Sequence, residues 1–359
     1  MTALEIATCG PLTTIQDCGR IGLSRMGLPA AGAMDQRALR IANALVGNPA
    51  GEAVIELAFA GLVGRAIGGD IEMAVAGALA DITCETRKEV THQSFVLRDG
   101  ETLRIGPLIT GAFAVVALAG GIAVPPMLGS RSLDLRAGIG GLDGRALRPG
   151  DRLPLNGSRV PFLSRWSAAV PLDRDAPIRI VLGPQDDAFT ERGLQTLIDR
   201  PYVVSNAVSR MAYRLDGPPI ERRSGVEILS DGTLPGSIQV PPDGQPIVLM
   251  ADRQTIGGYP KIGTVTSADL GRLAQRRPGE EVRFAMVSAH EAREIAAQVK
   301  LSEVEIQFGK YPAKSARAEQ PMFDAARIGN VADAVVDASD SATWEIPQRP
   351  LWMLTSGTR

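Results

Sequence analysis

Short apolar runs, separated by Gly, Pro or Asp, dominate the chain from residue 53 to residue 155. This spacing is typical of strands in a β-barrel or sandwich. Helical patterns do not alternate with the runs, which disfavours a doubly wound parallel sheet. We therefore predict a fold that is mainly β with a few helices. The strands expected in this region are Val54–Ala60, Ile71–Val75, Gln93–Leu97, Thr102–Ile105, Ala112–Ala119 and Arg152–Leu155.

Three segments carry helical signals instead. Apolar residues recur at helical spacing from Met34 to Val46, where Gly47 and then Pro49 end the pattern. A second apolar face runs from Phe189 to Ile198. Ser288 and Glu291 have the spacing of a capping box, which predicts a third helix through Val299.

The second half of the chain repeats the strand pattern of the first. A polar, proline-marked stretch at 156–176 predicts a linker between an N-terminal domain, 1–155, and a C-terminal domain, 177–300. The remaining residues, 301–359, lose the periodic hydrophobic pattern, and we expect this extension to be partly mobile. A Pro-Gly-acid turn precedes a strand near the end of each domain, at Pro149 and at Pro278. The strands expected in the second domain are Ile178–Leu182, Tyr202–Ser205, Ala212–Leu215, Val226–Leu229, Ser237–Val240, Ile247–Met250 and Gly263–Val265.

Composition excludes several classes of function. Of the 359 residues, 45% are hydrophobic and 22% charged, and the net charge is −2, so the chain has no basic field for nucleic acid. No apolar run approaches the length of a membrane span, and no signal peptide is evident, so we expect a cytoplasmic protein. The three cysteines form no C-x-x-C pair, so neither zinc nor a disulfide framework is predicted. A nucleophilic role for Cys18 is disfavoured, since only His92 and His290 could serve as its base.

The stretch from Ser230 to Lys261 is the richest in candidate chemistry. It combines glycines and prolines, which fix backbone geometry, with glutamines, one arginine and one lysine. Amides and a forked cation are the groups that bind a planar, polar ligand. The alternative is a pair of polar hairpins. The glycine-rich segment Arg136–Gly144 lacks the spacing of a dinucleotide fingerprint, which leaves an anion-binding loop or a plain turn.

Motifs spread over residues 4–298 carry a family resemblance. They are Thr14-Ile15-Gln16-Asp17, Gly32-Ala33-Met34-Asp35, Leu45-Val46-Gly47-Asn48, Arg136-Ala137-Gly138-Ile139-Gly140-Gly141, Gly183-Pro184-Gln185-Asp186-Asp187, Arg210-Met211 with Tyr213-Arg214-Leu215, and the stretch from Ser230 to Lys261. In this combination and order the chain resembles the biotin-dependent carboxyltransferase-like family, which includes allophanate hydrolase subunit 2, KipA and the C subunit of 5-oxoprolinase. Ser209, Ala212 and Ile256 depart from the family pattern, in which Asp, Gly and Thr are usual.

The resemblance implies two cyclophilin-like β-barrel domains and a KipI-like partner. Our first hypothesis is the C subunit of an ATP-dependent 5-oxoprolinase, which opens the lactam of 5-oxoproline to glutamate with a KipI-like B subunit and a LamB/YcsF-type A subunit. ATP would be bound by the assembled complex. One alternative is a carboxyltransferase that uses carboxybiotin, carried by another polypeptide, and a urea-like or amide acceptor. The other is a regulatory protein like KipA that binds a kinase inhibitor. The chain has neither a biotin attachment site nor a Walker A sequence.

The first hypothesis assigns roles to eight residues. Lys261 would supply a cation for negative charge on the activated lactam, and Arg253 would hold the substrate carboxylate. Asp231 or Asp35 would orient a cation or act as base. The alternative for Asp35 is that it complements the dipole of the helix it begins. The predicted substrate-binding residues are Gln239, Gln245, Arg210, Asp35 and Tyr259, with Lys261, Arg253 and Asp231 catalytic and no metal site.

Overall fold

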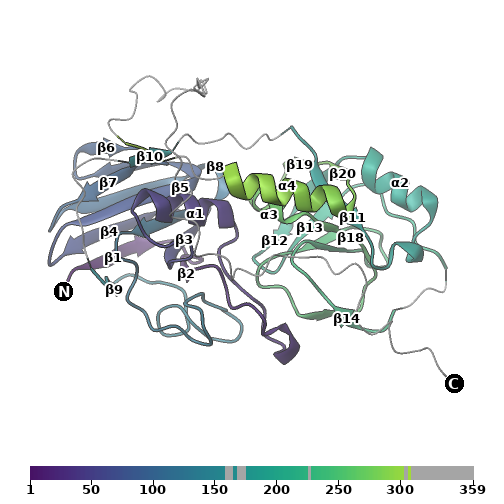
Figure 1. Ribbon diagram of the computed structural model, residues 1–359, viewed down its shortest axis with the longest axis horizontal. Helices are drawn as coiled ribbons and strands as arrows, with labels where there is room; N and C mark the ends of the chain where they lie inside the picture. Colours follow the sequence, from purple (N-terminus) through teal and green to yellow (C-terminus); the bar gives the residue numbers. More distant parts are fainter. Residues whose placement is uncertain (158–164, 168–174, 225–227, 303–305, 309–359) are drawn as a thin grey trace. The chain divides into compact units, whose positions relative to one another are not determined.

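The chain forms two compact units (Figure 1). The computed structural model describes residues 1–157, 165–167, 175–224, 228–302 and 306–308. The first unit contains the described residues up to position 173 together with the later segments Ala274–Arg277, 301–302 and 306–308. The second contains residues 174–273 and 278–300. Most of the expected linker and extension lies outside the described residues, so the domain boundaries stay predictions.

One curved nine-stranded sheet forms the wall of the first unit. Two long strands, β5 and β8, pair with each other along most of their length. They bend where Gly77 and Gly111 adopt φ values of 98° and 73°, which favour glycine. The strands are β1 (Ala3–Cys9), β2 (Thr14–Gln16), β3 (Val54–Ala58), β4 (Leu62–Ile67), β5 (Ile71–Cys84), β6 (Arg87–Glu89), β7 (Ser94–Leu97), β8 (Thr102–Leu118) and β9 (Arg152–Pro154).

Aliphatic side chains fill both faces of this sheet. One cluster inside the curve is built from Ile, Leu and Val residues of β1, β3, β5 and β8. On the other face lies α1 (Gln36–Leu45), whose Leu39 and Leu45 pack with small residues of β5 and β8. A short helix η1 (Ser24–Met26) precedes α1, and strands β10 (Arg165–Ser167) and β21 (Ile306–Phe308) form a separate pair.

A glutamine from late in the chain completes the first unit. The Oε1 of Gln275, which is 2% exposed, accepts hydrogen bonds from the backbone N–H groups of Ala112 and Phe113 at 3.0 and 3.1 Å. Its Nε2 donates to the Phe113 carbonyl at 2.9 Å and to Oδ2 of Asp35 at 2.8 Å. A Cβ on Gly111 would lie 2.4 Å from this Oε1, so Gly111 is also needed for the approach. The four bonds use the whole capacity of the buried amide.

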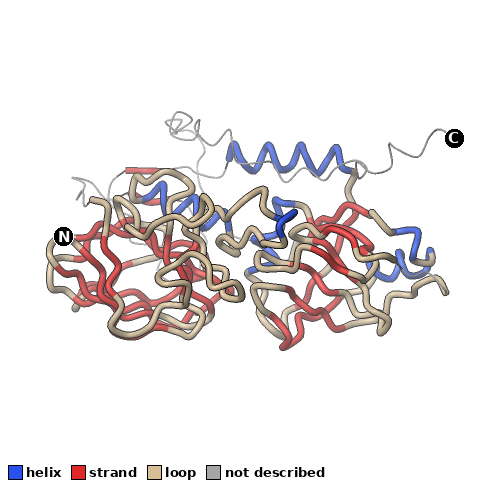
Figure 2. Tube along the Cα trace, turned by 90° about the horizontal axis from the view of Figure 1, so that it is seen from below, coloured by secondary structure: helices blue, strands red, loops and turns tan. Residues whose placement is uncertain are grey.

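The second unit is built on an eight-stranded sheet in the order β19-β12-β13-β16-β15-β18-β11-β20, and Figure 2 shows how strands dominate both units. Its core includes Tyr202 and Phe284, whose ring centroids lie 6.2 Å apart. A separate two-stranded ladder joins β14 to β17. The elements are β11 (Ile178–Leu182), η2 (Asp186–Ala188), α2 (Glu191–Asp199), β12 (Tyr202–Val208), β13 (Ala212–Asp216), β14 (Asp231–Gly232), β15 (Ser237–Gln239), β16 (Ile247–Leu249), β17 (Ile256–Gly257), β18 (Lys261–Val265), α3 (Ser267–Ala274), β19 (Glu281–Val282), β20 (Phe284–Met286) and α4 (Ala289–Ser302).

The predicted fold class, mainly β with few helices in two barrel-like units, is confirmed. The capping box is present, since Glu291 N–H donates to Ser288 Oγ at 3.1 Å and Ser288 N–H to Glu291 Oε2 at 2.7 Å. The strand expected at 226–229 is wrong in its described part, because Leu229 is 92% exposed and in no strand. The helix α3 and the strand β4 were not predicted. In the described part of the chain, no helix is both long and apolar enough to span a membrane.

A buried histidine in the first unit makes stability depend on pH. His92 is 8% exposed, and its Nε2 accepts the N–H of Gly77 at 3.3 Å, which requires the neutral ring. Burial, with a smaller contribution from Arg37, lowers the pKa of His92 from 6.5 to about 4. Below pH 6.5 the His92 ring is therefore protonated in the unfolded chain but stays neutral in the folded chain until the pH approaches 4. The free energy of unfolding consequently falls as the pH drops through this range.

We expect His92→Gln to flatten this acid dependence. Between pH 6.5 and pH 4 the wild type should lose about 3 kcal/mol of unfolding free energy through this group alone, at about 1.4 kcal/mol per pH unit. Urea denaturation at several pH values measures the slope of the two proteins. His290→Gln is the control, because the His290 side chain is 79% exposed. Equal slopes for wild type and His92→Gln would contradict the prediction.

Candidate functional site

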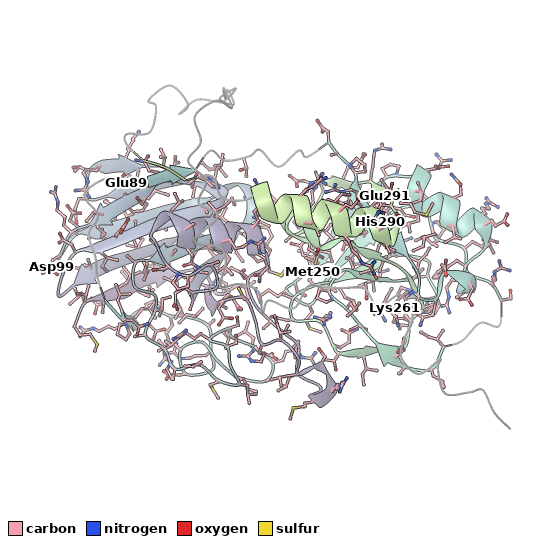
Figure 3. All side chains as sticks on the ribbon, viewed as in Figure 1. Glu89, Asp99, Met250, Lys261, His290 and Glu291 are labelled. Atoms are coloured by element: carbon pink, nitrogen blue, oxygen red, sulfur yellow. The ribbon has the colours of Figure 1, made fainter. Side chains whose placement is uncertain are left out.

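Lys261 is a buried cation at the first position of β18 in the second unit (Figure 3). Its side chain is 2% exposed, and its Nζ donates to Oδ2 of Asp231 at 3.1 Å. Asp231 begins the short strand β14, and its side chain is 39% exposed. The structure therefore joins two of the predicted catalytic residues in one ion pair, with the cation inside and the carboxylate at the surface.

The Asp231 carboxylate is held in its ionised form. Partial burial raises its pKa, but the hydrogen bonds from Lys261 and from the Gly232 N–H outweigh burial and hold the pKa below its usual range. Gln185 also donates to Oδ2 of Asp231, at 3.2 Å. At neutral pH this carboxylate is thus an acceptor that can orient a cation or take a proton.

A glutamine lies opposite the lysine and bonds a second glutamine. Gln239 stands opposite Lys261 in the antiparallel pairing of β15 with β18, next to a register shift, so the two side chains share one face of the sheet. The Gln239 side chain accepts from Nε2 of Gln254 at 3.4 Å and donates to the backbone carbonyl of Tyr259 at 3.2 Å. A Cβ on Gly257 would lie 2.3 Å from its Nε2, so a larger residue there would displace this amide. The Tyr259 side chain is itself exposed.

Arg253 is a second buried cation in the same stretch. It is 2% exposed, and within the described ranges its Nε and Nη2 have one acceptor, the Thr233 carbonyl, both at 3.4 Å. Its Nη1 has no hydrogen-bond partner among the described residues. Burial lowers the pKa of Arg253 to about 10, so the group remains charged at neutral pH. A buried guanidinium with spare donors is suited to binding a carboxylate or another small anion.

The remaining predicted residues have structural partners. Arg210 makes a bidentate ion pair with Asp252 at 2.8 and 2.9 Å, and both side chains are buried, so Asp252 supplies the carboxylate that Ser209 lacks. The side-chain amide of Gln245 bonds the N–H and carbonyl of Gly217 at 2.9 and 3.0 Å. Asp35 caps α1 through Ala38 N–H at 3.0 Å. Substrate-binding roles for Arg210, Gln245 and Asp35 stay untested predictions.

Other candidate groups show no such clustering. Burial and the neighbouring Asp17 raise the pKa of the Cys18 thiol, so it is protonated at neutral pH, in line with the expectation that it is no nucleophile. The segment Arg136–Gly144 is a loop, and the carboxylate of Asp134, just before it, accepts from the N–H of Arg136 at 3.0 Å. No group of three metal-type ligands occurs among the residues that the structure describes.

Comparison with known proteins places the chain in a family. A family model described as carboxyltransferase domain, subdomain A and B, matches residues 26–286, more than half of the 359-residue chain. The chain belongs to this family. The resemblance inferred from the separated motifs is thereby confirmed.

The relatives of this family member include a 5-oxoprolinase subunit and a urea amidolyase. The 5-oxoprolinase C subunit from Escherichia coli (strain K12) is 39% identical over 295 residues, 80% of this chain and 93% of that protein. The crystal structure of TTHA0988 matches 79% of this chain with a TM-score of 0.72 and 37% identity. The chain spans about half of that solved protein, 55% of its length. The K. lactis urea amidolyase structure matches 84% of this chain and 20% of its own, with a TM-score of 0.77 and 28% identity.

Sequence reasoning assigned no role to Gln185 or Gln254. Gln254 lies in the stretch from Ser230 to Lys261, and its amide side chain could have identified it as a candidate binding residue. Gln185 is 76 residues from Lys261, and it comes close only because β11 pairs with β18. The signal that could have found Gln185 is its position directly after the Gly183-Pro184 turn that ends β11.

Proposed function

We propose that this chain is the C subunit of an ATP-dependent 5-oxoprolinase, which opens the lactam of 5-oxoproline to glutamate. The proposal is supported by the 39% identity to the E. coli 5-oxoprolinase C subunit, which extends over 93% of that protein. Its partners would be a KipI-like B subunit and a LamB/YcsF-type A subunit. A chain that is one component of such an assembly is expected to act only when the other components are present.

The observation that carries the proposal is the cluster of Lys261, Asp231 and Gln239. An unstrained lactam opens only after its carbonyl is activated, and activation by phosphorylation or carboxylation adds negative charge near the ring. The Lys261 ammonium, 2% exposed, would stabilise that charge where water screens it little. Gln239 would bind the N–H and C=O of the lactam, since an amide side chain offers both a donor and an acceptor.

Arg253 would bind the carboxylate that 5-oxoproline carries. Its Nη1 has no partner in the described residues, so a substrate carboxylate would satisfy a donor that the fold leaves unused. Urea carries no such charge. Arg253 therefore favours an acidic lactam over a neutral urea-like acceptor.

ATP would supply the activation of the lactam carbonyl when the assembled complex binds it. The buried cations Lys261 and Arg253 suit an anionic, activated substrate, but the sequence has no Walker A pattern. We therefore assign no step of nucleotide chemistry to the residues of this chain. Their proposed work is to bind the substrate, to orient it and to stabilise its charge.

Carboxyl transfer from carboxybiotin is the second candidate function. It is favoured by the carboxyltransferase family model and by the similarity to the K. lactis urea amidolyase structure. The same Lys261 and Gln239 would then stabilise the enolate-like charge of an amide acceptor, and biotin would be carried by another polypeptide.

An assay of the co-purified complex tests the proposal. The chain is produced with the proteins encoded by its genomic neighbours, and glutamate release from 5-oxoproline is measured with and without ATP. We expect release that requires ATP and all three components. An intact assembly that releases no glutamate but carboxylates urea from carboxybiotin would replace the first function by the second.

A further inference from the structure

The side chain of Gln185 closes a ring of hydrogen bonds around the Lys261 ion pair. Its Oε1 accepts the backbone N–H of Lys261 at 3.1 Å, and its Nε2 donates to Oδ2 of Asp231 at 3.2 Å. That same oxygen accepts from Lys261 Nζ at 3.1 Å. The backbone N–H of Gln185 also donates to the Lys261 carbonyl, at 3.2 Å. One amide thus contacts both the lysine backbone and the carboxylate that pairs with the lysine ammonium.

Asp231 needs such support because its own strand is short. The ladder of β14 with β17 consists of two residue pairs, Asp231 with Gly257 and Gly232 with Ile256. The Asp231 side chain is 39% exposed, and a surface ion pair alone holds a carboxylate only weakly. Gln185, in contrast, follows β11, which is paired in the large sheet on both sides. The more firmly held element therefore anchors the less firmly held carboxylate.

We propose that Gln185 is a positioning residue that holds the Asp231 carboxylate against the Lys261 ammonium, so that the cation keeps one fixed orientation. The proposal deepens the proposed function, on which its kinetic readout rests. A merely structural role would be to attach the 183–185 turn to β18. The backbone bond from Gln185 to the Lys261 carbonyl already performs that attachment, whereas the bond to Asp231 adds nothing to it.

The first measurement does not depend on activity. The pKa of the Asp231 carboxyl is measured by NMR of aspartate labelled at the carboxyl carbon, with Asp231→Asn to assign the signal. Gln185→Met removes one hydrogen bond to the ionised form, so the pKa of Asp231 should rise by roughly half to one unit. Gln185→Glu keeps an acceptor for the Lys261 N–H but places a like charge beside Asp231, so the rise should exceed about one unit.

Two controls separate this effect from general disturbance. Gln195 donates to Asp199 at 2.6 Å on the exposed face of α2, so Gln195→Met removes the same kind of bond elsewhere and should leave the pKa of Asp231 unchanged. Asp243, whose pKa is lowered by Arg214, should titrate alike in all the proteins.

The second measurement is kinetic and uses the co-purified complex. Gln185→Met should lower kcat about tenfold with KM within about twofold, because a misplaced ammonium loses stabilisation of the transition state more than of bound substrate. An unchanged pKa of Asp231 in folded Gln185→Met overturns the inference, whatever the activity. A raised pKa in a complex that has no 5-oxoprolinase activity supports the positioning role and rejects only the proposed function.

Discussion

Lys261→Met in the assembled complex is expected to lower kcat/KM for 5-oxoproline by about a thousandfold. Removing a preorganised charge that faces developing negative charge costs a factor of this order. The expected loss is large because the Lys261 side chain is 2% exposed, so its charge acts where the dielectric screening is weak. Methionine keeps the length of the aliphatic chain, and the released Asp231 can be solvated, since it is 39% exposed. Glutamate release at limiting substrate measures the effect.

The matched control is Lys88→Met, which changes an exposed lysine in β6 of the first unit. It should retain full activity. Co-purification of Lys261→Met with its partners shows whether the assembly survives the change. A variant that assembles and keeps wild-type activity would remove Lys261 from the site. A variant that assembles, shows no enzymatic turnover and keeps the full biological effect in cells would instead favour the regulatory, KipA-like hypothesis.

Gln275→Leu is expected to lower the unfolding free energy by about 4 kcal/mol. The amide of Gln275 bonds two N–H groups and a carbonyl of β8, and Oδ2 of Asp35. Leucine has a similar volume but would leave these buried groups without that partner, and each such loss costs about 1–3 kcal/mol. The expected loss of unfolding free energy is smaller than the sum of the individual losses because the site can relax and admit water.

Urea denaturation of the isolated chain measures this change. Gln298→Leu, at an exposed position of α4, is the control and should change stability by less than about 0.5 kcal/mol. Gln275→Glu separates shape from hydrogen bonding. It keeps the acceptor for the two N–H groups but loses the donor and faces the Asp35 carboxylate, so it should destabilise as well. A loss under about 1 kcal/mol in both Gln275 variants would contradict the structural role.

Signals that lie within a few residues were predicted well. The helix from Gln36 is capped by Asp35, and the helix from Ala289 is preceded by the Ser288 capping box, because a cap bonds groups at most three residues away. The two long strands of the first unit were predicted as shorter pieces. In the sequence, Gly77 and Gly111 suggest that a strand ends there, yet in the structure they are bends within continuous strands.

The site was predicted in part for a related reason. One stretch of sequence, from Ser230 to Lys261, has residue types that indicate a polar binding site. It contains Asp231, Gln239, Arg253 and Lys261. The register that sets Gln239 opposite Lys261 could not be derived from that stretch, because a shift by one residue turns a side chain to the other face. Gln185 depends on strand pairing over 76 residues, and no local pattern encodes such a contact.

The place of Gln275 in the first unit sets an order for folding during synthesis. The first unit takes its chain up to Asp173 and then, later in the sequence, Ala274–Arg277 and the strand β21, so it stays incomplete while residues 174–273 emerge from the ribosome. At about 5–20 residues per second, that interval is roughly 5–20 s. For this time the N–H groups of Ala112 and Phe113 lack the amide that bonds them in the finished protein. A nascent chain stalled before Gln275 should be digested by protease faster in its first unit than one stalled well beyond Arg277.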